Sequence, residues 1–293
     1  MRPGRLDVGV VGAGRVGAVL GAALRLAEHK VVGASGVSEA SSTRIEALLP
    51  GTPRLDPEAV VRAADLVLLT VPDDALAPLV AGLAAVGAWR PGQIAVHASG
   101  LHGLAVLEPA ARAGALPLAV HPAMTFTGTS IDLARLREAV FAVTAPTPVL
   151  PIAQALVVEI GGEPVVVAEE DRALYHAAIV HGANHVVALV SQAMGALRAA
   201  GIEDPGRLIG PLVRASIDGA LSEAPDAATT LTGPVVRGDV GTVAAHVAAL
   251  ESRPGTLATY RALARATADL ALGAGRIGPA QYAGIMAAIG DER

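Results

Sequence analysis

A glycine-rich turn between an apolar run and an apolar helical pattern is the feature that most constrains the fold of this chain. Residues 8–11 are apolar, and GAGRVG follows them directly into AVLGAAL. In a strand-turn-helix unit, the first glycine allows the tight turn, the second lets a pyrophosphate approach the backbone, and the third lets the helix pack on the strand. The helix N-terminus then points free N–H groups at the phosphates. The sequence therefore predicts a dinucleotide-binding turn whose contacts are Gly12, Gly14, Arg15, Val16 and Gly17.

The residue at the end of the second predicted strand, 31–34, distinguishes NAD from NADP. Turns that bind NAD place a carboxylate about 20 residues past the glycines, where it bonds the ribose 2′-hydroxyl. Here Ser35 holds that place, Arg44 is near, and Glu39 is the only carboxylate of the segment. Hydroxyls and a guanidinium suit a 2′-phosphate, which a carboxylate would repel. We therefore predict NADP(H), with Ser35 and Arg44 as contacts; the alternative is a Ser-rich loop with Arg44 on a solvated helix face.

Short apolar strands alternate with helical patterns as far as residue 168. Further strands are expected at 66–71, 93–98, 116–120, 140–144 and 164–168. This alternation predicts an α/β fold, a doubly wound Rossmann sheet with right-handed crossovers. The remainder is helical, so we expect a nucleotide domain at 1–168 and an all-α domain at 169–293. Because strand carboxyl ends face the ligand crevice, Val71 and Pro72 are expected to line the nucleotide site.

The composition excludes several function classes. The chain has no cysteine, which excludes thiolate catalysis and Cys-ligated metals and suits a cytoplasmic protein. A net charge of −5 gives no reason to expect nucleic acid as a partner. The apolar stretches are broken by His, Asn, Arg or Asp, so none is expected to span a membrane, and the N-terminus leads into a strand without room for a signal peptide. Lys30 is the only lysine and precedes the second strand, so lysine catalysis is not expected.

Five segments spread along the chain carry a family resemblance: TVPDDAL, HASG, HPAMTF, YHAAIVHGANHVVAL and LTGPVVRGD. With them the chain resembles a bacterial family of Rossmann-like oxidoreductases whose C-terminal helical domain was long of unknown function. That family belongs to the superfamily of 6-phosphogluconate dehydrogenase, pyrroline-5-carboxylate reductase and ketopantoate reductase. The resemblance covers nearly the whole chain and implies an NAD(P)-dependent reductase that acts as a dimer, with ketopantoate as the best single substrate. Met124 departs from the family, which more often has a polar residue there.

Reduction of a carbonyl requires a proton for the developing alkoxide, and histidine is the simplest donor near neutral pH. Among eight histidines, His121 ends a predicted strand on the ligand side and is held in an extended turn by Pro122. Ser99 ends the neighbouring strand, where its hydroxyl can orient the carbonyl or a ribose. The alternatives are a turn histidine bonded to the backbone and an ordinary Ser-Gly turn.

The apolar helix expected over 171–200 carries four polar residues on one arc. At 3.6 residues per turn, Asn184 lies between His176 and His181, and we expect a polar pocket beside them because buried imidazoles need partners. The family resemblance favours His176 and Asn184 as the pair that faces the crevice. His181 and His185 have the i, i+4 spacing of a metal pair, but no third ligand is evident, so no metal site is predicted.

The segment LTGPVVRGD supplies the candidate substrate contacts. Arg237 is the candidate clamp for a substrate carboxylate, because a guanidinium donates two parallel hydrogen bonds. Thr232 lies in the same loop and is expected to reach the crevice. The alternative is local: Asp239 caps the helix that begins at Val240, and Arg237 pairs with Asp239 or with a phosphate.

Together these features predict an NADPH-dependent reductase of a small 2-oxo carboxylate, with ketopantoate favoured by the resemblance. One alternative is an enzyme of another acid, in the manner of prephenate dehydrogenase or pyrroline-5-carboxylate reductase. Another is a non-catalytic NADP(H)-binding sensor. The apolar helix over 173–197 predicts a homodimer, because a small helical domain cannot cover it alone.

Overall fold

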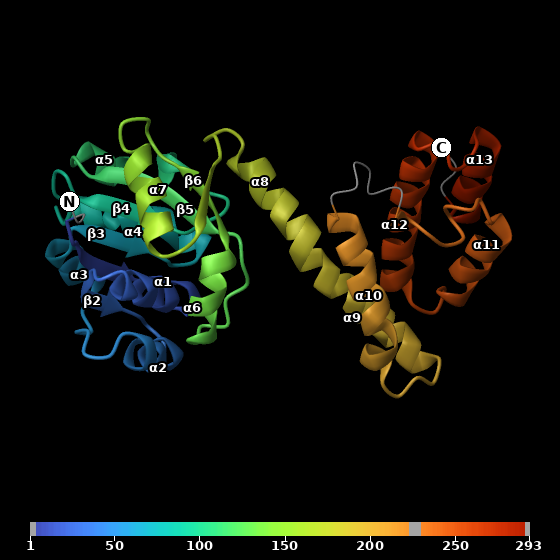
Figure 1. Ribbon diagram of the computed structural model, residues 1–293, viewed down its shortest axis with the longest axis horizontal. Helices are drawn as coiled ribbons and strands as arrows, with labels where there is room; N and C mark the ends of the chain where they lie inside the picture. The colour runs from blue at the N-terminus through green and yellow to red at the C-terminus, as the bar shows by residue number, and fades with distance from the viewer. Residues whose placement is uncertain (1–3, 223–229, 291–293) are drawn as a thin grey trace. The chain divides into compact units, whose positions relative to one another are not determined.

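The structure of the chain is a computed structural model that describes residues 4–222 and 230–290. The first three residues of the N-terminal segment considered above lie outside the described residues. Contacts divide the chain into two compact units, Met1–Val180 and His181–Arg293 (Figure 1). The domain boundary expected after residue 168 stays a prediction.

The first unit is built on a seven-stranded sheet in the order β2-β1-β3-β4-β5-β6-β7. The strands are β1 (Asp7–Val11), β2 (Lys30–Ser35), β3 (Leu66–Leu69), β4 (Ile94–His97), β5 (Leu116–Pro122), β6 (Val140–Thr144) and β7 (Glu163–Val166). All of β3 is buried, as a parallel strand covered on both faces should be. The predicted fold class, a mostly parallel α/β sheet followed by a helical region, is confirmed.

Helices cover both faces of this sheet (Figure 1). They are α1 (Arg15–Leu26), α2 (Glu39–Leu48), α3 (Pro57–Ala63), α4 (Asp73–Ala85), α5 (Glu108–Arg112), α6 (Ile131–Arg135) and α7 (Leu150–Glu159). Alternate residues of β3 enter opposite cores: Leu66 and Leu68 join the cluster with α1, α2 and α7, whereas Val67 and Leu69 join the cluster with α3, α4 and α5. Because side chains alternate along the strand, β3 packs against helices on both faces of the sheet.

The strand β6 departs from the expected pattern of parallel crossovers. It runs antiparallel to β5 and parallel to β7. The connection from β5 to β6 holds only α6 and the short 3-10 turn η2 (Leu136–Glu138), and an antiparallel pair needs no crossover helix. The short helices α5 and α6 and the 3-10 turn η1 (Leu104–Leu107) were not predicted, because so few residues show no clear helical period.

A long apolar helix begins in the first unit and continues into the second. It consists of α8 (Arg172–Ile179), the π-helical turn η3 (Val180–Asn184) and α9 (His185–Ala199). The arc of polar residues predicted at 3.6 residues per turn is therefore wrong through residues 180–184. A π-helix bonds i to i+5, so each turn takes more residues and the side chains point in other directions than in an α-helix.

By length and composition, the helix Arg172–Ala199 could cross a membrane. It has 28 residues, and an 18-residue window within it has a mean hydropathy of 1.3. The expectation that no apolar stretch qualifies is therefore wrong by these two measures, because His and Asn interrupt the stretch without adding fixed charges. Length and composition alone are weak evidence, so these two measures do not place this helix in a bilayer.

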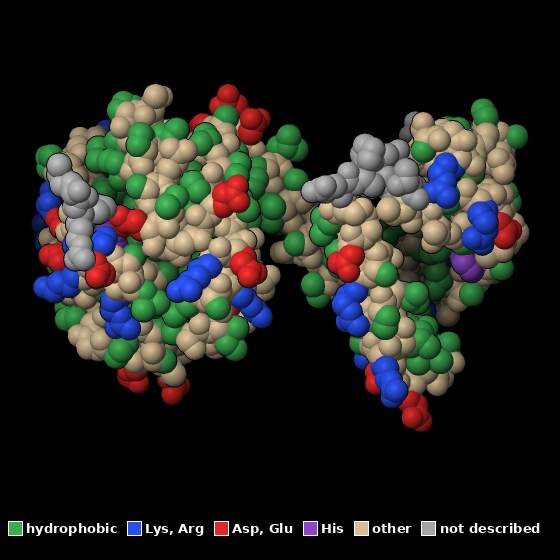
Figure 2. All heavy atoms as spheres, viewed as in Figure 1, with side chains coloured by type: hydrophobic (Ala, Val, Ile, Leu, Met, Phe, Trp, Pro, Cys, Tyr) green, Lys and Arg blue, Asp and Glu red, His purple; other side chains and the backbone are tan. Residues whose placement is uncertain are grey.

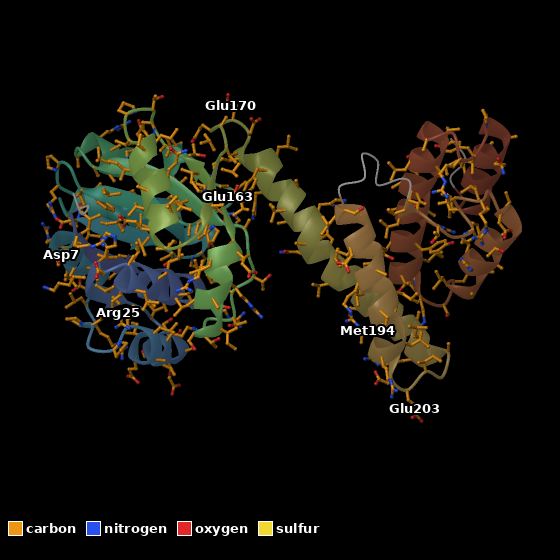
Figure 3. All side chains as sticks on the ribbon, in the orientation of Figure 1. Asp7, Arg25, Glu163, Glu170, Met194 and Glu203 are labelled. Carbon is orange, nitrogen blue, oxygen red and sulfur yellow. The ribbon has the colours of Figure 1, made fainter. Side chains whose placement is uncertain are left out.

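Among its described residues, the second unit contains α9 and four further helices, α10 (Pro205–Leu221), α11 (Val240–Ala249), α12 (Pro254–Gly273) and α13 (Pro279–Ala288). Asp204 and Asp239 cap α10 and α11 by accepting hydrogen bonds from backbone N–H groups. The core lies among α11, α12 and α13. Met194 lies on α9 and Glu203 in the turn before α10 (Figure 3). No residue of α9 is buried, so much of its apolar surface meets solvent.

Candidate functional site

In the glycine turn at the carboxyl end of β1, packing excludes a side chain at two of the three glycines and leaves space for one at the third. Gly12 has a φ of 93°, and a Cβ there would lie 2.9 Å from the backbone of Thr70. A Cβ on Gly17 would collide with the Thr70 hydroxyl and lie 2.5 Å from the Gly12 carbonyl oxygen. A Cβ on Gly14 would meet nothing closer than 3.9 Å. Packing therefore demands Gly12 and Gly17, whereas Gly14 leaves open space above the turn.

The turn lies at the point where the strand order reverses. β1 pairs with β2 on one side and with β3 on the other, so connections leave in opposite directions and open a crevice at the strand ends. Thr70 follows β3 and donates from its hydroxyl to the Gly12 carbonyl oxygen at 2.7 Å. Val71 lies beside Gly12, and Pro72 precedes the first turn of α4. Arg15 and Val16 begin α1. The open space at Gly14 and the start of α1 fit a pyrophosphate.

The serines after β2 bond mainly to the protein itself. The buried Ser35 accepts the Gly12 N–H at its hydroxyl at 3.3 Å, and its carbonyl accepts the Ala13 N–H at 2.7 Å. The Ser38 hydroxyl caps α2 by accepting the Ser41 N–H at 3.1 Å. These bonds match the Ser-rich loop that the sequence left as the alternative. Ser35 therefore stabilises the shape of the glycine turn, and its contact with a nucleotide stays a prediction.

Two arginines converge on the turn at Gly128, which follows β5. A Cβ on Gly128 would lie 2.8 Å from Arg44 Nε and 2.9 Å from Arg15 Cγ. The buried Asp132 carboxylate fixes this turn by accepting the N–H groups of Thr127 and Gly128, both at 2.8 Å. Within residues 4–222 and 230–290, neither guanidinium forms a salt bridge. Two such charges beside a nucleotide turn attract a phosphate; the sequence had named both arginines but not the turn that joins them.

The carboxyl end of β4 is held by a buried histidine. His97 accepts the Ser99 N–H at Nδ1 and donates from Nε2 to the Gly103 carbonyl oxygen at 2.9 Å. Burial lowers the pKa of His97 to about 4. The Ser99 hydroxyl accepts the N–H groups of Leu101 and His102, at 3.2 and 3.0 Å. Ser99 therefore forms the Ser-Gly turn of the alternative interpretation, with its hydroxyl already engaged.

Three rings meet where β4 and β5 end. His121 Nδ1 lies 2.8 Å from the Tyr175 hydroxyl, and the two rings are T-shaped with centroids 5.7 Å apart. The ring of His176 lies 6.2 Å from that of His121. Gly100 lies against both imidazoles, since a Cβ there would be 2.6 Å from His176 Cδ2 and 3.1 Å from His121 Nε2. The structure thus brings together His121 and His176, two of the predicted residues, and adds Tyr175.

His121 was expected to act as a proton donor that titrates near neutral pH, but its surroundings favour the uncharged ring. The pKa of His121 is lowered to about 4, mainly by burial and also by the positive charge of Arg172 and by the neighbouring His176, while Asp73 opposes them. His121 is therefore a neutral imidazole at pH 7. A neutral ring serves as a hydrogen-bond donor or acceptor and holds no extra proton to release.

Arg172, in the first turn of α8, is a functional candidate that the sequence analysis missed. Its side chain is 1% exposed. Nη1 donates to the Thr144 hydroxyl at 3.1 Å, and Nη2 donates to the Ser99 carbonyl oxygen at 2.6 Å. Burial lowers the pKa of the Arg172 guanidinium. Tyr175 was missed as well, although it directly precedes His176 in the family segment; nothing local showed that its hydroxyl reaches a strand end.

The other helix candidate, Asn184, belongs to the second unit and ends the π-helical turn as an exposed residue. His181 and His185, also exposed, lie with their Nδ1 atoms 3.3 Å apart. Among the described residues, no group of three potential metal ligands occurs. The pair therefore lacks a third protein ligand in this part of the chain.

The loop before α11 bears out part of the local alternative for Arg237. Asp239 caps α11, accepting the Thr242 N–H at 3.1 Å and the Thr242 hydroxyl at 2.7 Å. The exposed Arg237 contributes a positive charge that helps to lower the pKa of Asp239. No salt bridge joins the two in the described ranges. The Arg237 side chain thus remains accessible to an anion.

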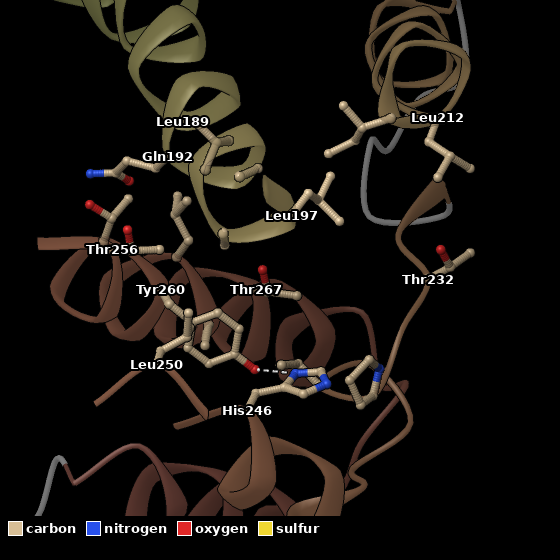
Figure 4. Close-up of a pocket in the computed structure, with 18 of the residues that line it drawn as sticks. Leu189, Gln192, Leu197, Leu212, Thr232, His246, Leu250, Thr256, Tyr260 and Thr267 are labelled. Carbon is tan, nitrogen blue, oxygen red and sulfur yellow. Dashed lines mark hydrogen bonds between the residues drawn. The ribbon is translucent and has the colours of Figure 1, made fainter. Parts of the chain in front are cut away.

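Thr232 lines a cavity of about 610 Å³ inside the second unit (Figures 2 and 4). The walls are leucines and other apolar residues of α9, α10 and α12, and Figure 4 shows Leu189, Leu197 and Leu212 around the space. At one side His246 Nδ1 lies 3.0 Å from the Tyr260 hydroxyl. The cavity is therefore mostly apolar, with few polar groups to orient a ligand.

Comparisons with known proteins agree with this architecture. Residues 1–122 match a Rossmann-like domain, and residues 139–267 match a domain of unknown function, DUF2520. No curated protein matches the sequence.

Solved structures share the fold over most of the chain. Protein BF3122 of Bacteroides fragilis, named provisionally as an NADP oxidoreductase, is 22% identical, with a TM-score of 0.74 over 90% of this chain and 98% of its own. An imine reductase of Myxococcus stipitatus in complex with NADP+ is 18% identical (TM-score 0.63, 93% and 95% covered). A pyrroline carboxylate reductase of Plasmodium falciparum with NADP bound is 13% identical (TM-score 0.57, 92% and 100% covered). The chain is thus similar to a Rossmann-like domain over residues 1–122 and to the domain of unknown function DUF2520 over residues 139–267.

Proposed function

We propose that the protein is an NADP(H)-dependent oxidoreductase. The observation that carries this proposal is the pair of arginines, Arg15 and Arg44, beside a glycine turn whose Gly14 no protein packing requires. A phosphate at the arginines and a pyrophosphate over Gly14 would account for both features. Two solved relatives of the same fold hold NADP or NADP+, and both are named as reductases.

NADPH, when bound, supplies a hydride to a carbonyl or imine carbon. The residues of this chain would bind the cofactor, orient the substrate and provide a proton. Residues 12–17, Ser35, Arg44, Val71 and Pro72 would hold the dinucleotide. His121 and His176 lie together at the ends of β4 and β5, where a substrate oxygen or nitrogen would need a donor.

For the substrate we propose a small 2-oxo carboxylate, with ketopantoate as the first to test. The support is the family resemblance and the accessible guanidinium of Arg237, which can hold a carboxylate by two hydrogen bonds. Asn184 and Ser99 as orienting donors, and Thr232 as a substrate contact, stay predictions. Because the Ser99 hydroxyl already accepts two N–H groups, its own O–H is the group that would reach a ligand.

A cyclic imine acid is the second candidate substrate. The imine reductase and the pyrroline carboxylate reductase among the solved relatives favour a C=N bond over a C=O bond. A prephenate-like acid and a non-catalytic NADP(H) sensor are further alternatives.

We also propose a homodimer in the cytoplasm, with no nucleic acid or membrane as partner. The support is apolar surface on the second unit, where Val187, Leu208 and Leu212 are 70%, 50% and 65% exposed. A second copy of the chain would remove such a surface from water.

The test is turnover and binding in His121→Ala and His176→Ala. Both variants are expected to bind NADPH as the wild type does and to lose reduction, because the groups that face the substrate are gone. Near wild-type rates in both would contradict the assigned roles.

A further inference from the structure

The two ring nitrogens of His121 have different surroundings. Nδ1 lies 2.8 Å from the Tyr175 hydroxyl, and Nε2 lies on the ring side that faces Gly100. Within the described ranges, Nδ1 is the only ring nitrogen of His121 with a hydrogen-bond partner. Gly100 has no side chain, which lets its backbone lie against this side of the ring, since a Cβ would be 3.1 Å from Nε2. Nδ1 thus bonds the phenol, and Nε2, on a partly exposed residue, is the ring nitrogen left for a substrate atom.

A buried cation lies one turn before Tyr175 on the same helix. Arg172 donates to Thr144 and to the Ser99 carbonyl oxygen, while its buried Nε has no partner within residues 4–222 and 230–290. The Glu169 carboxylate, whose charge acts on Arg172, accepts the N–H groups of Leu104 and Ala105 instead. A buried guanidinium without a carboxylate stabilises negative charge that develops nearby.

We propose that Tyr175 and His121 form a proton relay for the reduction proposed above, with Arg172 as the positioning residue that stabilises the phenolate. The inference rests on the proposed function. It makes Tyr175 the source of the proton and His121 the group that passes it to the substrate.

The relay follows from the charge state of His121. Burial lowers its pKa to about 4, and Arg172 and His176 act in the same direction against Asp73. An imidazolium is therefore scarce at pH 7, so the ring can give a proton at one nitrogen only if it takes one at the other. Tyr175 supplies it: burial raises the pKa of this phenol, and the charge of Arg172 acts against that rise.

The proton transfers balance as follows. The electron pair comes from the hydride of a bound reduced nicotinamide. The Nε2–H bond of His121 breaks as an O–H or N–H bond forms on the substrate, and Nδ1 takes the proton of the Tyr175 hydroxyl. His121 is then the neutral Nδ1–H tautomer and Tyr175 is a phenolate. The resting state returns when Nε2 takes a proton from solvent and Nδ1 gives its proton back to the Tyr175 oxygen.

The chain provides a matched control. His246 Nδ1 lies 3.0 Å from the Tyr260 hydroxyl, with ring centroids 5.8 Å apart and an interplanar angle of 80°. The corresponding centroid distance and angle for His121 and Tyr175 are 5.7 Å and 80°. Tyr260→Phe therefore removes the same kind of bond in the second unit, at a hydroxyl to which we assign no contact with cofactor or substrate.

The first readout needs neither substrate nor cofactor. Nitrogen NMR of the imidazoles in the wild-type protein is expected to show His121 as the neutral Nε2–H tautomer, with Nδ1 accepting from Tyr175. The Nδ1–H tautomer would overturn the relay, because the ring would then donate to the phenol oxygen. The tautomer is measured on the resting protein, so it tests the relay even if the proposed function fails.

The second readout is reduction of the substrate that the wild type turns over. Tyr175→Phe is expected to keep NADPH affinity and to slow reduction on the order of a hundredfold, while Tyr260→Phe stays close to the wild-type rate. A Tyr175→Phe variant at the wild-type rate would overturn the relay. Failure of the wild type on every carbonyl and imine would instead count against the proposed function.

Arg172 is tested through the phenol. The ultraviolet absorbance of tyrosinate, taken as the difference between proteins with and without Tyr175, reports its ionisation. Arg172→Gln is expected to raise the pKa of Tyr175 and slow reduction, and Arg172→Lys to restore part of both. An unchanged Tyr175 titration in Arg172→Gln would contradict the role of Arg172.

Discussion

Gly14 and Gly17 occupy one turn for different physical reasons, which makes them a test at the scale of single residues. A Cβ on Gly17 would collide with Thr70, whereas one on Gly14 meets nothing closer than 3.9 Å. Gly14→Ala is therefore expected to keep the wild-type unfolding free energy and to weaken NADPH binding at least about tenfold, by occupying the space of the pyrophosphate. Gly17→Ala is expected to lower the unfolding free energy and to weaken NADPH binding as well.

Urea unfolding and NADPH titration of the two variants separate the effects. If Gly14→Ala bound NADPH as tightly as the wild type, the turn would not hold the pyrophosphate.

Arg44 tests the choice between the two nicotinamide cofactors. Its guanidinium lies beside Arg15 at the Gly128 turn and forms no salt bridge in the part of the chain that the structure describes. Arg44→Ala is expected to raise the Kd for NADPH by about tenfold or more and to leave the Kd for NADH unchanged, because only NADPH carries the 2′-phosphate. Isothermal titration of both cofactors measures this; an equal loss for both would contradict a 2′-phosphate site.

Buried histidines predict how stability changes with pH. His97 and His121 have pKa values of about 4 in the folded protein, against about 6.5 in an unfolded chain. Between these values the unfolded state binds protons that the folded state refuses, so the unfolding free energy falls as pH decreases. From pH 7 to pH 5 the loss is expected to be about 2 kcal/mol for the fully buried His97, and less for His121.

Denaturant unfolding at the two pH values checks this, with His97→Gln as the comparison, since its unfolding free energy should fall less. Equal stability of the wild type at pH 7 and pH 5 would show that neither histidine is held neutral.

Residues whose roles are local were predictable, and residues whose roles depend on distant contacts were not. The glycines of residues 12–17 and the place of His121 at a strand end follow from short segments. Arg172 and Tyr175 reach the site through bonds to Ser99, Thr144 and His121, which are far away in the sequence. The hydrophobic periodicity of a sequence does not predict contacts between residues that are far apart along the chain.

At the scale of elements, the connection from β5 to α6 holds the Gly128 turn, beside which Arg15 and Arg44 lie. Asp132 is fully buried and accepts hydrogen bonds from Thr127 and Gly128. Asp132→Ala is expected to lower the unfolding free energy by about 2–4 kcal/mol, because it leaves buried N–H groups without partners, and to weaken NADPH binding by loosening the Gly128 turn.

The exposed cap Asp204 is the matched control. Asp204→Ala removes one acceptor at the start of α10 and is expected to lower stability by about 1 kcal/mol without affecting NADPH. Thermal unfolding and NADPH titration of the two variants compare them. Equal stability losses would mean that the Asp132 bonds contribute no more than a surface cap.

Elements with a strong hydrophobic period were predicted well, and irregular ones were not. The strands and the long apolar helix, expected over 171–200 and found over Arg172–Ala199, match the expected ranges closely, since apolar runs define them. The antiparallel β6, the short helices and the π-helical turn depend on how neighbouring segments pack. The π-helical turn also changes the arc on which Asn184 was placed.

At the scale of the whole molecule, the exposed apolar residues of the second unit predict a homodimer. Leu212→Asp is expected to yield monomers of 29.2 kDa where the wild type has twice that mass, because a charge would enter the apolar contact. Leu26→Asp, at a similarly exposed leucine of the first unit, is the control (68% and 65% exposed). Light scattering at micromolar concentration measures the mass, and a monomeric wild type would contradict the prediction.

The most direct test of the proposed function is NADPH oxidation, followed by absorbance, across a panel of 2-oxo acids including ketopantoate and cyclic imine acids, with NADH in parallel. We predict turnover of at least one acid, with NADPH preferred over NADH. Tight NADPH binding without oxidation of any member of the panel would contradict an oxidoreductase of these substrates and favour a nucleotide-binding sensor.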